Sequence, residues 1–350
     1  MSRWLTEAVP RGRVAAFRTL VYLFVAGDLL VFTPWIRARV DVPGDLYQPL
    51  FVGRVLPLPT PNPALVNVIF WALLLLALLA ATGRAPRLLG WPVFVLYLEW
   101  MIIAMSYGKV DHDRFGLLVA LAVLPTAGRA RHGDPARTEA GGWALRVTQL
   151  AVVCTYFLAA WAKFRFGGLD WATGSVLAKA IIRRGTDLAD LIAQVPHLLL
   201  VAQFGILAFE LLSPLVFVLP ERWRLAMVGF FYSFHLATIA TITISFAPHL
   251  VAMTSFLPLE RVRPVLALRK LAARRSAAGH RRPGSDPIPQ PAGVGSPPAH
   301  TSAPVGADAP ADPAPVTADA SRDDVPASAE ARQGGGQLAG GEPVPGAALP

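Results

Sequence analysis

One lysine, Lys163, stands where an apolar stretch of the sequence ends, and a lysine in such a place has two uses. The stretch closes with Tyr156-Phe-Leu-Ala-Ala-Trp-Ala-Lys163, and Arg165 follows two residues later. If its surroundings partly desolvate the amine and Arg165 opposes a second positive charge, the neutral form is favoured, and a neutral amine is a base. If the side chain instead reaches the aqueous interface, it anchors the helix end and does no chemistry. From the residues alone both interpretations stay open.

Other polar side chains lie inside apolar runs, on several different predicted helices. Ionisable residues inside a membrane mark an internal site, although each one alone could simply hold helices together by hydrogen bonds. At about 1.5 Å per residue, the acids and the histidine inside the runs fall at a similar depth below the outer surface. We therefore expect a polar cavity that has Lys163 and His112 at its outer rim and is lined by Asp28, Glu99, Asp111, Tyr156, Glu210 and His235.

The elements that must position these residues are membrane-spanning helices. Hydrophobic residues make up 54% of the 350 residues and charged residues only 16%. The apolar residues gather in runs of roughly 20, the length that crosses about 30 Å of hydrocarbon. The sequence thus predicts an all-α, polytopic integral membrane helix bundle of about eight spans, two of them short. The expected ranges are 17–32, 64–82, 89–107, 115–124, 143–163, 198–219, 223–244 and 248–257.

The composition divides the chain into two parts. Residues 1–260 hold the predicted bundle, including an amphipathic segment over 167–197 that we expect on the membrane surface or against the bundle. Residues 261–350 begin with a basic juxtamembrane segment and continue as a Pro/Ala/Gly-rich tail. This tail cannot bury enough apolar surface to offset its ordering entropy, so we expect it to be disordered.

Charge and motifs exclude several functions. The net charge of +9 does not indicate nucleic-acid binding, because the arginines flank apolar spans, where orientation and anionic lipid explain them. Their distribution predicts a multi-pass protein of the cell membrane with a cytoplasmic N-terminus. The only cysteine is Cys154, and the sequence has no glycine-rich phosphate loop, Gly-x-Ser-x-Gly turn or His-Glu-x-x-His helix. We predict no metal site.

Four short motifs, in this order, give the chain a family resemblance. They are Phe17-Arg-Thr-Leu with Asp28; Asp111-His112-Asp113-Arg-Phe-Gly-Leu-Leu; Tyr156 to Lys163 with Asp170-Trp171 and Gly174; and Ser233-Phe234-His235. Together they resemble the vitamin K-dependent gamma-carboxylase family and its bacterial relatives, the horizontally transferred transmembrane domain (HTTM) proteins. The resemblance covers residues 17 to about 258.

The resemblance implies a chemistry for two of these residues. The lysine that matches Lys163 is held to deprotonate reduced vitamin K, which then reacts with dioxygen, and the histidine that matches His112 supports that step. The resemblance therefore implies catalytic roles for Lys163 and His112 and a reduced vitamin K-type quinone as cofactor. This chain has Asp111 where the carboxylases have asparagine, and it has no counterpart of their large luminal domain.

Three functions remain open from the sequence. The first is a reduced-quinone-dependent membrane enzyme with a lysine base and an unknown acceptor. The second is a non-enzymatic membrane partner in the maturation or export of a small antimicrobial-type peptide, a role that bacterial relatives of this family have. The third is a small-solute transporter, although the sequence shows no internal repeat of the kind that many transporters have.

Overall fold

Each long apolar run of the sequence is helical in the computed structural model, which describes residues 2–56 and 58–262. In hydrocarbon a backbone must satisfy its own hydrogen bonds, and a helix does so within one segment. Local signals set some of the ends. The Asn62 side chain accepts from Leu65 N with Pro63 at the first helical position, and Thr138 accepts from Gly141 N. The predicted basic segment and tail lie outside the described residues, apart from 261 and 262.

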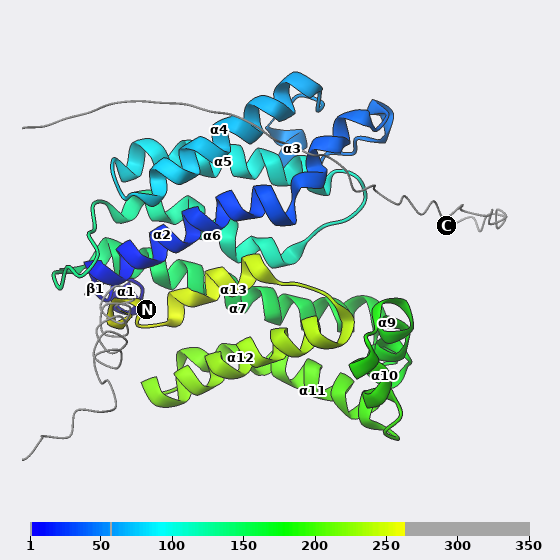
Figure 1. Ribbon diagram of the computed structural model, residues 1–350. Coiled ribbons are helices and arrows are strands. Elements are labelled where there is room, and N and C mark those ends of the chain that lie inside the picture. The colour runs from blue at the N-terminus through cyan, green and yellow to red at the C-terminus, as the bar shows by residue number, and fades with distance from the viewer. Residues whose placement is uncertain (1, 57, 263–350) are drawn as a thin grey trace, which may run out of the picture. The chain divides into compact units, whose positions relative to one another are not determined.

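The principal helices of the described chain are eight, and they run back and forth along one direction (Figure 1). The first, α2, is continued by a π-helical turn, Asp28–Phe32. The eight are α2 (Arg11–Gly27), α4 (Pro63–Ala81), α5 (Pro86–Met105), α6 (Phe115–Val123), α7 (Glu139–Gly167), α11 (Leu198–Leu212), α12 (Glu221–Ile242) and α13 (Ala247–Met253).

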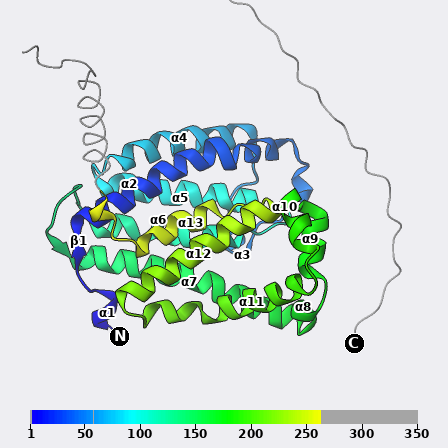
Figure 2. The same ribbon diagram turned by 60° about the horizontal axis from the view of Figure 1, so that its bottom comes forward.

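Shorter elements connect these helices. The helical ones are α1 (Ser2–Leu5), α3 (Phe51–Val55), α8 (Asp170–Thr173), α9 (Val176–Arg184) and α10 (Asp187–Ala193), with 3-10 turns at Pro34–Asp41, Gly44–Leu46, His112–Arg114, Leu124–Ala127, Ser213–Phe217, Thr254–Phe256 and Leu259–Arg261. Two two-residue strands, β1 (Val9–Pro10) and β2 (Arg137–Thr138), pair antiparallel. Figures 1 and 2 show α8, α9 and α10 together at one end of the bundle and β1 and α1 at the other.

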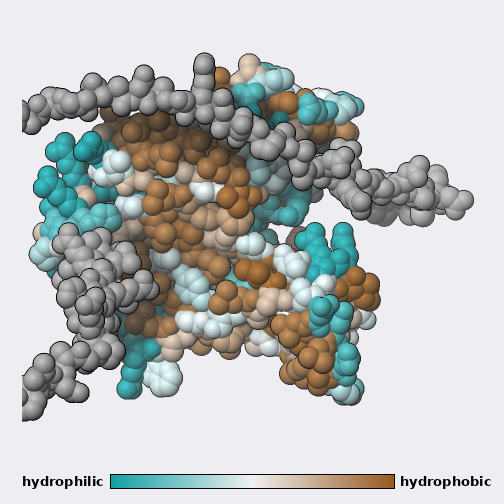
Figure 3. Space-filling view, in the orientation of Figure 1, coloured by the Kyte–Doolittle hydropathy of each residue, from teal (hydrophilic) through white to brown (hydrophobic). Residues whose placement is uncertain are grey.

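The prediction of an all-α multi-pass membrane bundle is confirmed. Six helices of the described chain are long and apolar enough to cross a membrane, the first of them being α2 with its π-helical continuation. The other two, α6 and α13, occupy the positions predicted for the short spans and pack against each other and against α7. The face seen in Figure 3 is hydrophobic over the middle of the bundle and hydrophilic at its two ends.

Within residues 2–56 and 58–262 the core has two clusters of buried apolar residues. The larger lies among α2, α4, α5 and α6 and includes Phe17, Tyr22 and Trp100. The smaller lies among α7, α11, α12 and α13 and includes Tyr156 and Phe231. In its most apolar stretch α2 is 56% buried and α12 only 17%, so α12 lies at the outside of the bundle.

Two local features differ from the prediction or add detail to it. Helix α7 does not end at Lys163 but continues for another turn to Gly167, and Gly168 follows with a φ of 56°. A lysine fits in the last turn of a helix because its amine can reach past the helix end. The amphipathic segment folds as α8, α9 and α10, which contact α11, and α9 and α10 also contact α12.

Candidate functional site

A cavity of about 210 Å³ lies among α7, α11, α12 and α13, and it brings together five of the eight predicted site residues. Its wall also contains aromatic rings and apolar side chains, including Trp171, Phe234 and Phe246. The polar side chains that line it are those of His112, Thr155, Tyr156, Lys163, Glu210, His235, Thr238 and His249.

Lys163 and Glu210 form an ion pair across this cavity wall. The Lys163 ammonium donates to both carboxylate oxygens of Glu210, which joins α7 to α11. The Glu210 side chain is only 8% exposed and that of Lys163 is 22% exposed, so the pair lies largely inside the protein. The Lys163 nitrogen also lies 5.0 Å from the centre of the Trp171 ring, within cation–π range.

The charge beside Lys163 is therefore opposite to the one that the sequence suggested. Arg165 was expected to oppose protonation of the lysine, but its guanidinium lies over the Phe166 ring, at 5.6 Å, on the exposed side of α7. The nearby carboxylate of Glu210 is the partner instead. A helix turns by about 100° per residue, so residues two apart point to different sides, and Lys163 and Arg165 do so here.

Tyr156 and two histidines form the inner part of the cavity wall. The Tyr156 hydroxyl lies 2.6 Å from His235 Nε2 and 3.3 Å from the sulfur of Met253. The rings of His235 and His249 are 5.3 Å apart, centre to centre. His235 Nδ1 and both ring nitrogens of His249 are buried without a hydrogen-bond partner in the protein. Burying a polar nitrogen without a hydrogen-bond partner destabilises the protein, and a molecule bound in the cavity could supply that partner.

His112 lies at the mouth, where this cavity meets a second one of about 400 Å³. The two cavities share His112 and Phe246. Desolvation by the surrounding protein and the positive charge of Lys163 lower the pKa of His112, while Asp111 acts in the opposite direction. His112 is therefore a neutral acceptor or donor at neutral pH, and it faces both cavities.

Asp111 lines only the outer of the two cavities. Its carboxylate forms an ion pair with Lys109 at 2.7 Å. The next acid along the chain, Asp113, lines the same outer cavity, and burial raises its pKa to about 6. The Asp111-His112-Asp113 loop thus places His112 in the wall of the inner cavity and both acids in the wall of the outer cavity.

Asp28 and Glu99 do not line the inner cavity, and this part of the prediction was wrong. Asp28 is fully buried in another network, where its carboxylate accepts from Arg114 at 2.7 Å and from Tyr97 at 3.0 Å. Thr33, which hydrogen-bonds to the Asp28 carbonyl oxygen, continues that network. Glu99 is half-buried on α5. The depth estimate was insufficient because depth does not say which side of a bundle a residue faces.

His249 is the cavity histidine that the sequence did not select. It follows Pro248 at the start of α13, a helix too short to give a periodic pattern. The sequence signal was the type of residue alone, a histidine at the start of a short apolar segment. In the structure it is 1% exposed and lies 4.7 Å from Tyr156, ring centre to ring centre.

Metal ligation is not indicated by the geometry of the described residues. Within residues 2–56 and 58–262, no group of three or more His, Cys, Asp and Glu side chains is arranged to hold a metal ion. The chemistry of the cavity is that of a lysine–carboxylate pair, a phenol and imidazoles among aromatic rings. Comparison with family models, with curated proteins and with solved structures gives no match to this chain.

Proposed function

We propose that the inner cavity binds a reduced quinone and that the Lys163–Glu210 pair takes a proton from it, in a protein of the cell membrane. The observation that carries this proposal is that the pair shares one aromatic-walled cavity with three histidines. A hydroquinone is a flat aromatic ring with hydroxyl groups on opposite sides. It needs apolar surfaces against its faces and polar partners at its edges, and this cavity offers both.

The size and position of the cavity support this ligand class. An engineered cavity of about 150 Å³ binds benzene, and the volume of 210 Å³ here leaves room for a larger ring. Quinones are lipid-soluble, and the α11 and α12 helices that bound the cavity have most of their surface outside the protein core. The histidine nitrogens that lack protein partners are suited to the oxygen atoms of the ring.

The pair can accept a proton by two routes with the same end point. In the ion-pair form the Glu210 carboxylate takes the hydroxyl proton while the Lys163 ammonium stabilises the quinol anion. Alternatively, Lys163 first passes its proton to Glu210 and then acts as the base itself. Both routes leave an ammonium beside a quinol anion. His112, at the mouth, is placed to position the ring or to relay a proton.

Membership of the HTTM family, with the quinol chemistry of the gamma-carboxylases, is part of this proposal. The motifs supply His112, Tyr156, Lys163 and His235, and these four residues line one cavity although they come from three separate segments of the chain. The acceptor substrate is not part of the proposal, because the described residues form no domain resembling the luminal domain of the carboxylases.

The alternative is a non-enzymatic partner for a small peptide in maturation or export. The observation that favours it is the exposure of α12, of which only 17% is buried over its apolar stretch. A peptide helix packed there would bury the same surface that lipid otherwise covers. Under this alternative the cavity residues stabilise the bundle and no quinol binds.

The test is anaerobic titration of the purified protein with a reduced naphthoquinone, menadiol, followed by absorbance. Deprotonation shifts the absorption of a hydroquinone to longer wavelength, so bound quinol anion has its own difference spectrum. We expect this spectrum with the wild-type protein. We expect Lys163→Gln and Glu210→Gln to bind menadiol, measured by equilibrium dialysis, without forming the anion.

Lys179→Gln is the matched control. Lys179 is an exposed lysine on α9 at the same end of the bundle and does not line the cavity. It should give the wild-type spectrum. Failure of the wild-type protein to bind menadiol would refute the quinol proposal, and cross-linking of a photoreactive peptide to α12 would then support the peptide-partner alternative.

A further inference from the structure

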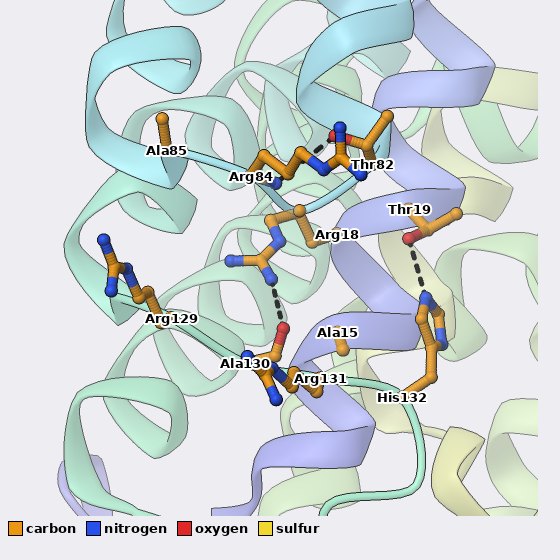
Figure 4. Close-up of a pocket in the computed structure, with 11 residues that line it drawn as sticks. Ala15, Arg18, Thr19, Thr82, Arg84, Ala85, Arg129, Ala130, Arg131 and His132 are labelled. Carbon is orange, nitrogen blue, oxygen red and sulfur yellow. Dashed lines mark hydrogen bonds between the residues drawn. The ribbon is translucent and has the colours of Figure 1, made fainter.

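The other end of the bundle has a cavity of about 490 Å³ that is lined by arginines (Figure 4). Three segments form it: the first half of α2, the turn between α4 and α5, and the stretch 129–132 before β2. Its charged lining residues are Arg18, Arg84, Arg129 and Arg131. No carboxylate is among the residues that line it.

Arg18 is a buried cation without a counter-charge. Its side chain is 1% exposed, and its guanidinium donates to the carbonyl oxygens of Gly128 at 2.9 Å and Ala130 at 2.7 Å. Its Nε is buried and has no hydrogen-bond partner. In the part of the chain that the structure describes, Arg18 forms no ion pair. Buried charges in proteins are usually paired. An anion bound in the cavity beside this guanidinium would supply the missing opposite charge.

Three further arginines line the same cavity as Arg18. Arg84, Arg129 and Arg131 are exposed, and the described residues give none of them a carboxylate partner. In Figure 4 they come from two different segments and lie around Arg18, while His132 points to Thr19. The His132 Nε2 atom lies 3.0 Å from the Thr19 hydroxyl. Four guanidinium groups without a carboxylate partner among the described residues therefore line one cavity.

The turn between α4 and α5 holds this arrangement in place. Gly83 has a φ of 74° and Ala85 a φ of 43°, both in the left-handed region. A Cβ on Gly83 would lie 3.0 Å from Arg18 Nη2, so the turn packs directly against the guanidinium. A left-handed alanine costs backbone free energy, and such strained residues gather at sites that bind ligands.

We propose that this cavity binds a phosphate group. Guanidinium groups are planar and donate two parallel hydrogen bonds to phosphate oxygens, and several of them together neutralise the charge of a phosphate. The cavity lies at the end of the bundle where the N-terminal arginines gather, the side that faces anionic lipid if that end is cytoplasmic. The phosphate can belong to a lipid headgroup or to a soluble molecule, and the chemistry of recognition is the same.

The experiment compares two sources of phosphate on the purified full-length protein. One arm measures thermal unfolding in detergent with and without inorganic phosphate, with chloride at equal ionic strength as reference. The other arm measures retention of phosphatidylglycerol against phosphatidylcholine by native mass spectrometry. The site variant is the double substitution Arg84→Gln and Arg131→Gln, which leaves the buried Arg18 in place. The control is Arg3→Gln with Arg222→Gln, two exposed arginines at the same end that do not line the cavity.

We expect the site variant to bind its phosphate ligand roughly tenfold more weakly or worse, and the control to bind as the wild type does. Loss of phosphatidylglycerol alone would identify a lipid headgroup as the source, and loss of stabilisation by inorganic phosphate would identify a soluble phosphate. Equal behaviour of the site variant and the control in both arms would overturn the proposal, because it would show only a general effect of surface charge.

Discussion

Lys163 on α7 donates to both carboxylate oxygens of Glu210 on α11. A lysine that serves only as an anchor at the membrane surface needs no such partner. A lysine that exchanges a proton benefits from one, because the carboxylate can hold the proton while the amine is neutral.

Substitution of Lys163 by arginine separates these two roles. Arginine can form the same ion pair with Glu210 but stays protonated, since its pKa exceeds about 12. If Lys163 itself takes the quinol proton, Lys163→Arg should fold, bind menadiol and yield as little quinol anion as Lys163→Ala, whereas Lys163→Arg should still form the anion if Glu210 takes the proton. The anaerobic difference spectrum measures it. Full anion formation by Lys163→Arg would exclude the lysine as a base.

The buried pair of Asp28 and Arg114 should affect stability rather than ligand binding. Removing one partner leaves an uncompensated buried charge, so Asp28→Ala should lower the free energy of unfolding by about 3–5 kcal/mol. The double variant Asp28→Leu with Arg114→Met removes both charges and should lose much less. Unfolding by heat, followed by circular dichroism, measures both. A larger loss in the double variant would show that this network needs its charges.

Protonation of Asp113 predicts a pH-dependent stability. Burial raises its pKa from the ordinary value of 3.8 to about 6, so the folded protein binds a proton more tightly than the unfolded chain does. Stability contributed by this proton is fully present below about pH 4 and is lost as the pH rises through about 6. Asp113→Asn should therefore raise the melting temperature at pH 7.5, by roughly 2–4 °C. The gain should vanish at pH 4, and a gain of equal size at both pH values would contradict this account.

The two ends of the described chain should lie on the same side of the membrane. The Arg13 guanidinium forms two hydrogen bonds with the Glu260 carboxylate, at 2.8 and 2.7 Å, which holds the start of α2 beside the end of the bundle. Reporters fused at the N-terminus and after Val262 should both report the cytoplasm. Opposite locations would mean that α6 or α13 does not complete a crossing.

The sequence was sufficient to predict where the helices lie in the chain, but not which side of each helix packs against its neighbours. Each apolar run had to be helical because lipid offers the backbone no other hydrogen-bond partner. Glu210 and Asp28 fall at similar depths in the sequence-based estimate, yet one meets Lys163 and the other meets Arg114. Which acid meets which cation depends on the rotation and packing of the helices. No single-sequence pattern contains that information.

The candidate site was predicted in part for the same reason. Lys163, Tyr156, Glu210, His112 and His235 were selected, and all five line one cavity. The charge beside Lys163 was mistaken, because Arg165 is near in sequence and Glu210 is near only after α7 and α11 have packed. His249 was not selected, because α13 has only seven residues and its burial comes from its neighbours.

The position of Lys163 near the end of its helix also matters while the chain is being made. Glu210 follows 47 residues later, so at a synthesis rate of about 5–20 residues per second the lysine exists for roughly 2–9 s before its partner does. During that interval α7 must enter the bilayer with an unpaired cation. Because the helix ends at Gly167, four residues after Lys163, the amine can stay in the aqueous interface until α11 has inserted and Glu210 can pair with it. A lysine two turns deeper in the helix would enter the hydrocarbon as an unpaired charge. The full free-energy cost of that insertion would fall before Glu210 had been synthesised.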